Sequence, residues 1–232
     1  MKKVLTFVLS ILMLGLSSYA QNINRVDKKG WKQGKWEQSY SNGALRYRGQ
    51  FRNNEPYGEF RNYYPTGGIK SISQYKDSGI EVYVSSFHLN GKPLATGKFV
   101  RQKKDSIWNY FSDLDGKRVA SESYHDGRKE GRSIIFYPES GKPVEVTTYK
   151  NGLKTGPWRK YFPDGTLSQM RHYVQDTLQG DFQVNSIQGK ILIKGSYKKG
   201  FQDGLWITYD SLGNPIKQTT YHRGIPVKTK EK

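Results

Sequence analysis

The chain of 232 residues contains no cysteine, only four histidines and no apolar run long enough to cross a bilayer. Without cysteine there is no disulfide and no lipobox residue to acylate. The longest apolar stretch, Val4 to Leu16, falls short of the roughly 20 residues that a membrane-spanning helix needs. These absences exclude a disulfide-stapled scaffold and a lipoprotein, and they disfavour a membrane anchor.

The N-terminal segment has the layout of a secretory signal peptide. Two lysines precede the apolar run, and Ser18 and Ala20 place small residues at the two cleavage subsites. We therefore expect residues 1–20 to form a signal helix that is cleaved before Gln21. The mature protein is then exported, either to the periplasm or to the medium.

Acidic residues are few: 38 Lys and Arg stand against 20 Asp and Glu, a formal net charge of +18. A basic surface attracts anionic lipid headgroups, acidic glycans, nucleic acid or acidic proteins. Charge of one sign also keeps long sheets from associating, so solubility is an equally good explanation. Export counts against nucleic acid as the partner.

A pattern recurs eight times along the chain at intervals of 24 or 25 residues. The units start at Gly34, Gly58, Val82, Ser106, Gly131, Gly156, Gly180 and Gly204. Two residues later, six of the units carry a large aromatic: Trp36, Phe60, Trp108, Trp158, Phe182 and Trp206. Every unit also closes on an aromatic: Phe51, Tyr75, Phe99, Tyr124, Tyr149, Tyr173, Tyr197 and Tyr221. Such periodicity is typical of repeat proteins, and these rings are the expected structural ladder.

Turn signals divide each unit into two short strands. Asn-Gly and Asp-Gly pairs such as Asn42-Gly43 interrupt aromatic and β-branched runs, and a second set such as Asn151-Gly152 joins one unit to the next. The sequence therefore predicts an all-β protein, an elongated antiparallel meander of about eight β-hairpin repeats. At about 4.8 Å per strand, sixteen strands would extend over roughly 75 Å.

Alternation within the strands predicts two unlike faces. In the first unit Trp36 and Phe51 share one face, while Arg46 and Arg48 point the other way. The basic residues chosen as the candidate binding face are Arg46, Arg48, Lys70, Arg159 and Lys160.

Glycine recurs two residues before the closing aromatic at Gly49, Gly97 and Gly195. It marks either a ring lying over bare backbone or a bulge, and the sequence leaves both open.

The expected organisation is a signal peptide (1–20), a lead-in (21–30), the eight repeats (31–224) and a basic tail (225–232). No linker breaks the array. Unit three, with Val82, Val84 and His88, departs most from the pattern.

Segments 156–165 (GPWRKYFPDG) and 34–43 (GKWEQSYSNG) resemble the bacterial variant of the MORN repeat, whose signature is Gly-x-Trp-x-x-Tyr-Tyr-x-x-Gly. Segments 58–64 and 204–209 are similar. The resemblance implies a β-hairpin repeat sheet that acts as a scaffold for protein or lipid contacts, with no catalytic residue in the motif. Many bacterial members carry an antitoxin label, and eukaryotic members are linked to acidic phospholipids.

Catalytic and metal-binding patterns are sparse. His125, His172 and His222 are about two units apart, and at roughly 10 Å per hairpin they cannot share a metal ion with bonds of about 2 Å. Paired carboxylates fall in turns, which favour Asp and Glu for their own reasons. No nucleophile elbow or phosphate loop is present. We expect no catalytic residue, no cofactor and no metal.

The leading hypothesis is an exported, non-enzymatic repeat scaffold whose partner is a protein. The alternatives are a peripheral envelope protein on anionic lipid or glycan, an antitoxin-like inhibitor, and an enzyme of unrecognised type. A platform for single-stranded nucleic acid is disfavoured, because the rings recur in the register that the sheet needs for its own cohesion.

Overall fold

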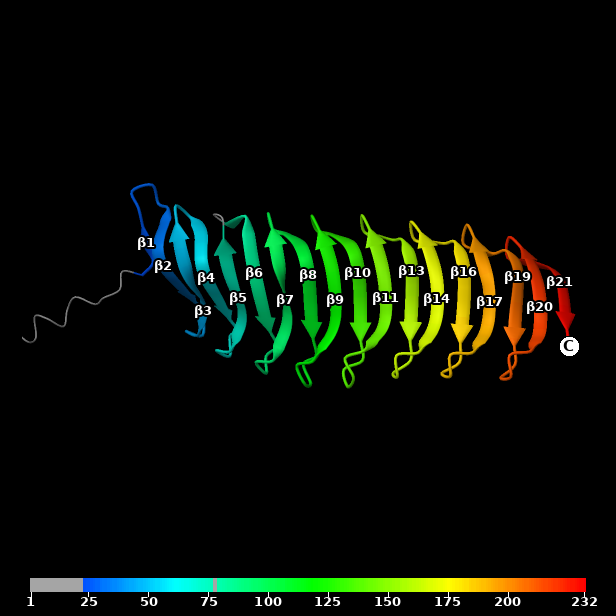
Figure 1. Ribbon diagram of the computed structural model, residues 1–232. Coiled ribbons are helices and arrows are strands. Elements are labelled where there is room, and N and C mark those ends of the chain that lie inside the picture. Colours follow the sequence, from blue (N-terminus) through cyan, green and yellow to red (C-terminus); the bar gives the residue numbers. More distant parts are fainter. Residues whose placement is uncertain (1–22, 77–78) are drawn as a thin grey trace, which may run out of the picture.

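The computed structural model describes residues 23–76 and 79–232. This part of the chain folds into one open antiparallel sheet, in which the strands stand side by side in chain order from β1 to β21 (Figure 1). The predicted all-β meander of hairpin repeats is confirmed. The predicted signal peptide lies outside the described residues, and within those residues no helix could span a membrane.

Eight hairpins lie between a short first strand, β1 (Arg25–Val26), and the last strand, β21 (Ile225–Glu231). The first five hairpins comprise β2 (Lys32–Ser39), β3 (Leu45–Arg52), β4 (Glu55–Tyr63), β5 (Ile69–Lys76), β6 (Glu81–Phe87), β7 (Pro93–Val100), β8 (Lys103–Phe111), β9 (Arg118–His125), β10 (Arg128–Phe136) and β11 (Pro143–Lys150). In the last three hairpins the first arm is split: β12 (Leu153–Lys154), β13 (Gly156–Tyr161), β14 (Leu167–Val174), β15 (Thr177–Leu178), β16 (Gly180–Asn185), β17 (Ile191–Lys198), β18 (Phe201–Gln202), β19 (Gly204–Tyr209) and β20 (Pro215–His222). The segment expected only as a basic tail thus provides strand β21.

The turns that join successive hairpins form one long edge of the sheet, along the top of Figure 1. In every such turn that the structure describes completely, the two central residues are left-handed, as with Asn53 (φ 52°) and Asn54 (φ 68°), which is the signature of a type I′ turn. These turns also bond to the strand that follows the preceding turn: the amide of Asn54 donates to the carbonyl of Lys32 in β2 at 3.2 Å, and that of Asp176 donates to the carbonyl of Lys154 in β12 at 3.0 Å. Backbone bonds therefore tie neighbouring units together beyond the strand ladder.

The opposite edge is held by a row of side-chain bonds that explains the second tyrosine of the repeat motif. The hydroxyl of Tyr40 donates to the carbonyl of Tyr63 in the next unit at 2.8 Å, and Tyr64 and Tyr137 make the equivalent bonds. In unit three the position holds His88, whose Nε2 lies 3.1 Å from the carbonyl oxygen of Phe111. The side chain of His88 therefore contacts a carbonyl of the next unit, as the tyrosine does in units one, two and five.

The residue that starts each unit is small because the backbone there is left-handed. Positive φ occurs at the start of every unit except the third, from 59° at Ser106 to 92° at Gly131. The strand register shifts where such a unit pairs with the preceding hairpin, as between β7 and β8, so these units begin with a β-bulge. Val82 has no positive φ, and β5 and β6 pair without a shift. The irregular third unit is thus a unit without its bulge.

Ser106 is the one non-glycine among the bulged unit starts, and a left-handed backbone costs an L-residue about 1–2 kcal/mol. We expect Ser106→Gly to raise the free energy of unfolding by about 0.5–1 kcal/mol. The gain is smaller than the full strain energy, because glycine loses more conformational entropy than serine when the chain folds. The control is Ser121→Gly in β9, which should instead lower stability by a similar amount. Urea titrations measure both, and a loss of stability in Ser106→Gly would contradict the bulge argument.

Five of the six large aromatics near the unit starts are buried, and Trp36 in the first unit is half-buried. Exposed fractions are 7% for Phe60 and 4% for Trp108, and Trp158, Phe182 and Trp206 are also buried. Except for Trp158, each of these rings packs edge-on against a closing aromatic. Phe60, for example, lies 5.1 Å from Phe51 and 5.3 Å from Tyr75 between ring centroids. A single-layer sheet therefore obtains its core from rings that lie across successive units.

Gly49, Gly97 and Gly195 satisfy both interpretations left open by the sequence. Each lies at a register shift and under a ring of the next unit; a Cβ at Gly97 would lie 2.2 Å from the Trp108 ring. The ring comes from the following hairpin rather than from the strand paired within the unit. The bulge shifts the strand register, and the glycine leaves space for the ring, so together they position the next ladder ring.

Candidate interaction surface

The predicted binding residues do not share one face. Arg48 and Arg159 lie on the face opposite the ladder, which we call the outer face; Arg159 pairs with Met170 and Val146 across its neighbours. Lys160 is the next residue, pairs with Gln169 and Glu145, and therefore lies on the ladder face with Trp158. Grouping Arg159 with Lys160 on one face was wrong, because adjacent residues of a strand point to opposite sides.

Nor are the outer-face residues close together along the sheet. Arg46 and Arg48 belong to β3 and Lys70 to β5, whereas Arg159 belongs to β13. Two strands occupy roughly 10 Å, so Arg159 lies about 35–45 Å from the others. The candidate site therefore reduces to Arg46, Arg48 and Lys70, which together with Arg52 we call the N-terminal patch.

Tyrosine rings accompany all four cations of the N-terminal patch. The guanidinium of Arg52 lies 5.0 Å from the ring centre of Tyr57, and that of Arg48 lies 5.7 Å from Tyr63. Arg46 and Lys70 lie 5.9 Å from the rings of Tyr40 and Tyr64, respectively. All four cations are exposed. Ring contacts restrict the cations while leaving N–H donors free for a carboxylate or phosphate.

Carboxylates are interleaved with these cations. Glu59 bonds to Arg61 at 2.6 Å, and Glu37 lies 3.9 Å from Arg48 on an exposed part of the sheet. The surface is therefore a mosaic of charge rather than a uniformly positive field. Exposed pairs of this kind contribute little to stability, so these side chains are available to reorganise around a partner.

The ladder face carries cations of its own, which the sequence analysis did not assign to it. Lys32, Lys104, Lys129 and Lys154 each occur two residues before a unit start. The ammonium of Lys104 lies 4.6 Å from the ring centre of Trp108 and 5.0 Å from Tyr124. Lys129 and Lys154 repeat the arrangement over Tyr149 and Tyr173. Their recurrence at one position of the repeat, two residues before the unit start, was the available signal.

Unit five lacks a ladder ring and fills the position with a polar cluster. Ser133 takes the place of the ring, and beside it Lys129 bonds to Glu122 at 2.7 Å while the Tyr124 hydroxyl donates to Glu122 at 2.6 Å. Burial and the bond to Glu122 raise the pKa of Tyr124. Burial raises the pKa of Glu122, but the hydrogen bonds from Lys129 and Tyr124 outweigh it and lower this pKa overall. The Lys129 and Glu122 pair is therefore ionised at neutral pH.

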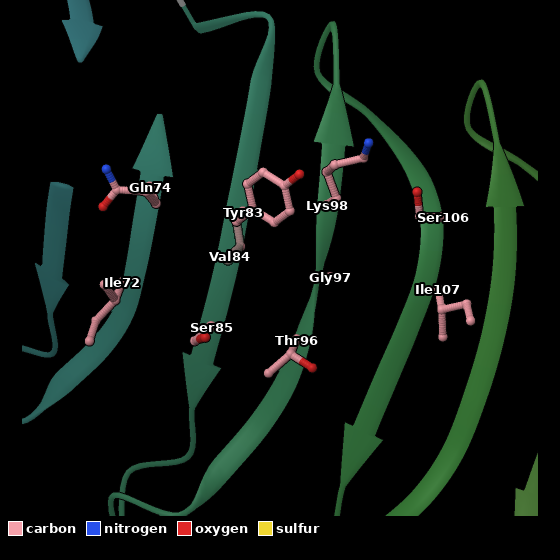
Figure 2. Close-up of a pocket in the computed structure, with 10 residues that line it drawn as sticks. All are labelled: Ile72, Gln74, Tyr83, Val84, Ser85, Thr96, Gly97, Lys98, Ser106 and Ile107. Atoms are coloured by element: carbon pink, nitrogen blue, oxygen red, sulfur yellow. The ribbon is translucent and has the colours of Figure 1, made fainter. Parts of the chain in front are cut away.

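Units two to four contain two hollows, one on each face. The outer-face groove, of about 520 Å³, is shown in Figure 2, where Ile72, Tyr83 and Ile107 project from three strands around Lys98. Lys98 is held by Glu81 at 3.2 Å, which raises its pKa. The hollow on the ladder face, of about 560 Å³, is lined by Glu55, Pro56, Ser73, Tyr75, Gly79, Val82, Val84, Phe99 and Gln102.

Two of the histidines lie beside single carboxylates rather than in a cluster. Nδ1 of His125 lies 3.3 Å from Asp105, and Nδ1 of His222 lies 3.7 Å from Asp203. Within residues 23–76 and 79–232, no three His, Asp or Glu side chains converge as metal ligands would.

Comparison with known proteins identifies the repeat. No curated protein is a match in sequence. The solved structure titled "Crystal Structure of TcdB2-TccC3-Cdc42" is similar at 9% identity and a TM-score of 0.21, over 84% of this chain and 13% of that chain, and so low a score carries no argument. The family model of the MORN repeat variant matches residues 32–53, 56–77 and 154–175, which lie in units one, two and six. The chain therefore contains three repeats that match the MORN repeat variant, and the same hairpin recurs in the other units, which is consistent with a MORN-repeat protein.

Proposed function

We propose that this MORN-repeat protein is an exported, non-enzymatic scaffold that binds another protein through the N-terminal patch. A sheet of β-hairpin repeats fits a repeat interaction module. The observation that carries the finer proposal is the pairing of Arg46, Arg48, Arg52 and Lys70 with tyrosine rings on an exposed strand surface. Arginine and tyrosine are enriched among the residues that dominate protein–protein binding energy.

A protein partner suits the N-terminal patch better than a lipid or glycan surface. Glu37 and Glu59 lie among the cations, and a partner with a defined charge pattern can match both signs. A fluid anionic surface rewards only the positive charges and is repelled by the carboxylates. Affinity capture from the envelope fraction of the producing cell is the first experiment, because it identifies the partner on which the binding measurements below depend.

The charge of the N-terminal patch should control this binding. We expect Arg46→Glu, Arg48→Glu and Lys70→Glu together to weaken capture of the partner at least about tenfold at low salt and to flatten its salt dependence. Thermal melting should change little, because exposed charges contribute little to stability.

The control makes the same change of charge elsewhere on the outer face, with Arg159→Glu, Lys194→Glu and Lys198→Glu. This variant should retain partner binding. Equal losses in the two variants would mean that net charge alone drives binding, and strong salt-sensitive binding of the wild type to protein-free vesicles of anionic lipid would favour the envelope alternative.

A further inference from the structure

The hollow on the ladder face coincides with a missing ring. Six units place a large aromatic two residues after the unit start, whereas unit three has Val84 at this position. Val84 lines the hollow together with Tyr75 and Phe99, the closing aromatics of units two and three. The hollow therefore occupies the place where the pattern of the fold would put a ring.

The neighbouring unit shows how such a place accommodates a ring. Phe60 lies between the closing aromatics of units one and two, at 5.1 Å from Phe51 and 5.3 Å from Tyr75, with both contacts edge-on. Tyr75 and Phe99 are the equivalent pair around Val84. Burial raises the pKa of Tyr75, so its ring is an uncharged wall.

Unit five shows that a missing ring does not by itself leave a hollow. There the Lys129 and Glu122 pair, joined by Tyr124, occupies the position beside Ser133. Unit three has Ser73 and Val82 at the corresponding places and retains about 560 Å³ of open volume. Aromatic walls around a volume of this size suit a phenyl or indole ring.

The charges next to the hollow indicate what carries that ring. Lysines of the ladder face flank the hollow on both sides. Lys104 pairs across the strands with the lining residue Phe99, and the ammonium of Lys32 lies 4.7 Å from the ring centre of Phe51, in the strand beside the lining residues of β4. Among the described lining residues, Glu55 is the one carboxylate. Ladder-face cations on both sides of the hollow complement an acidic segment.

We propose that the hollow around Val84 is a binding site for an aromatic side chain, up to indole in size, carried by an acidic segment of a partner protein. The inserted ring would complete the ladder by packing edge-on between Tyr75 and Phe99. This inference rests on the proposed protein-binding function and adds a second contact to the N-terminal patch, on the opposite face of the sheet.

The test uses the acetylated and amidated peptide Glu-Glu-Trp-Glu-Glu, with an alanine analogue as its control. Ring currents from the bound indole should shift the NMR signals of the Val82 and Val84 methyl groups, and the alanine peptide should leave them unmoved. Fluorescence anisotropy of labelled peptides should show about tenfold tighter binding of the tryptophan peptide. This comparison needs no variant protein.

A second arm fills the hollow from within. Val84→Trp should weaken binding of the tryptophan peptide about tenfold, whereas Ser85→Trp, which adds the same side chain to the outer face of the same strand, should leave it intact; melting curves check that both variants fold. Equal binding of the two peptides by the wild type, or unchanged binding by a folded Val84→Trp, would overturn the inference. The charge-reversal variant of the N-terminal patch tests the proposed function separately. If that variant loses the partner as expected but the wild type binds the two peptides equally, only the proposal for the hollow is rejected.

Discussion

Trp108→Ala is expected to lower the free energy of unfolding by about 3–5 kcal/mol, the usual cost of removing a buried aromatic side chain. Trp108 is 4% exposed, lies 4.8 Å from the ring of Phe99 and covers the bare backbone of Gly97. Its indole N–H donates to the carbonyl of Lys98 at 3.1 Å. No neighbouring side chain can close the gap, since the sheet has only one layer.

The control is Trp31→Ala at the first end of the array. Trp31 is 38% exposed and its ring is contacted by the ammonium of Lys29 at 4.7 Å. We expect a cost of less than about 1.5 kcal/mol, because end units of a repeat array have a neighbour on one side only. Guanidinium titrations followed by circular dichroism measure both. Equal losses would show that the rings do not act as a central ladder.

The sequence revealed the period, the hairpins and the rings of this fold because each has a local cause. Asn-Gly pairs require a left-handed backbone, and an aromatic repeated every 24 or 25 residues must lie at one register of the sheet. The small residue at each unit start was also visible. Its reason, a bulge that seats the ring of that unit, depends on the pairing between hairpins and could be seen only in the structure.

The candidate site was less accessible from sequence. Lys160 was assigned with Arg159 by its charge, although strand alternation already separates the two. Lysines such as Lys104 were not assigned to a face, and in the structure a long apolar stem lets the ammonium lie over Trp108. Ser133 and Val84 look alike in sequence as missing rings, yet one position is filled and the other is hollow. The difference comes from residues of adjacent strands.

Gly195→Ala tests the seating of the ladder rings directly. A Cβ at this position would lie 2.3 Å from the body of the Trp206 indole, so the ring must move. Trp206 also packs against Phe182 and Tyr197, with ring centroids 5.0 and 5.2 Å away, and its N–H donates to the Ser196 carbonyl. We expect a loss of about 1–3 kcal/mol in the free energy of unfolding, as for overpacked cores.

Gly68→Ala is the matched control, because a Cβ there meets no atom within 4 Å and the backbone is not left-handed. It should change stability by less than about 0.5 kcal/mol. The decisive measurement is a double-mutant cycle in denaturant with Trp206→Ala. Once the indole is removed, Gly195→Ala should become neutral or slightly stabilising, since alanine restricts the unfolded chain more than glycine does. Additive losses would instead mean that Gly195 is needed for its backbone alone, and that the bulge, rather than the ring above it, sets the register between units.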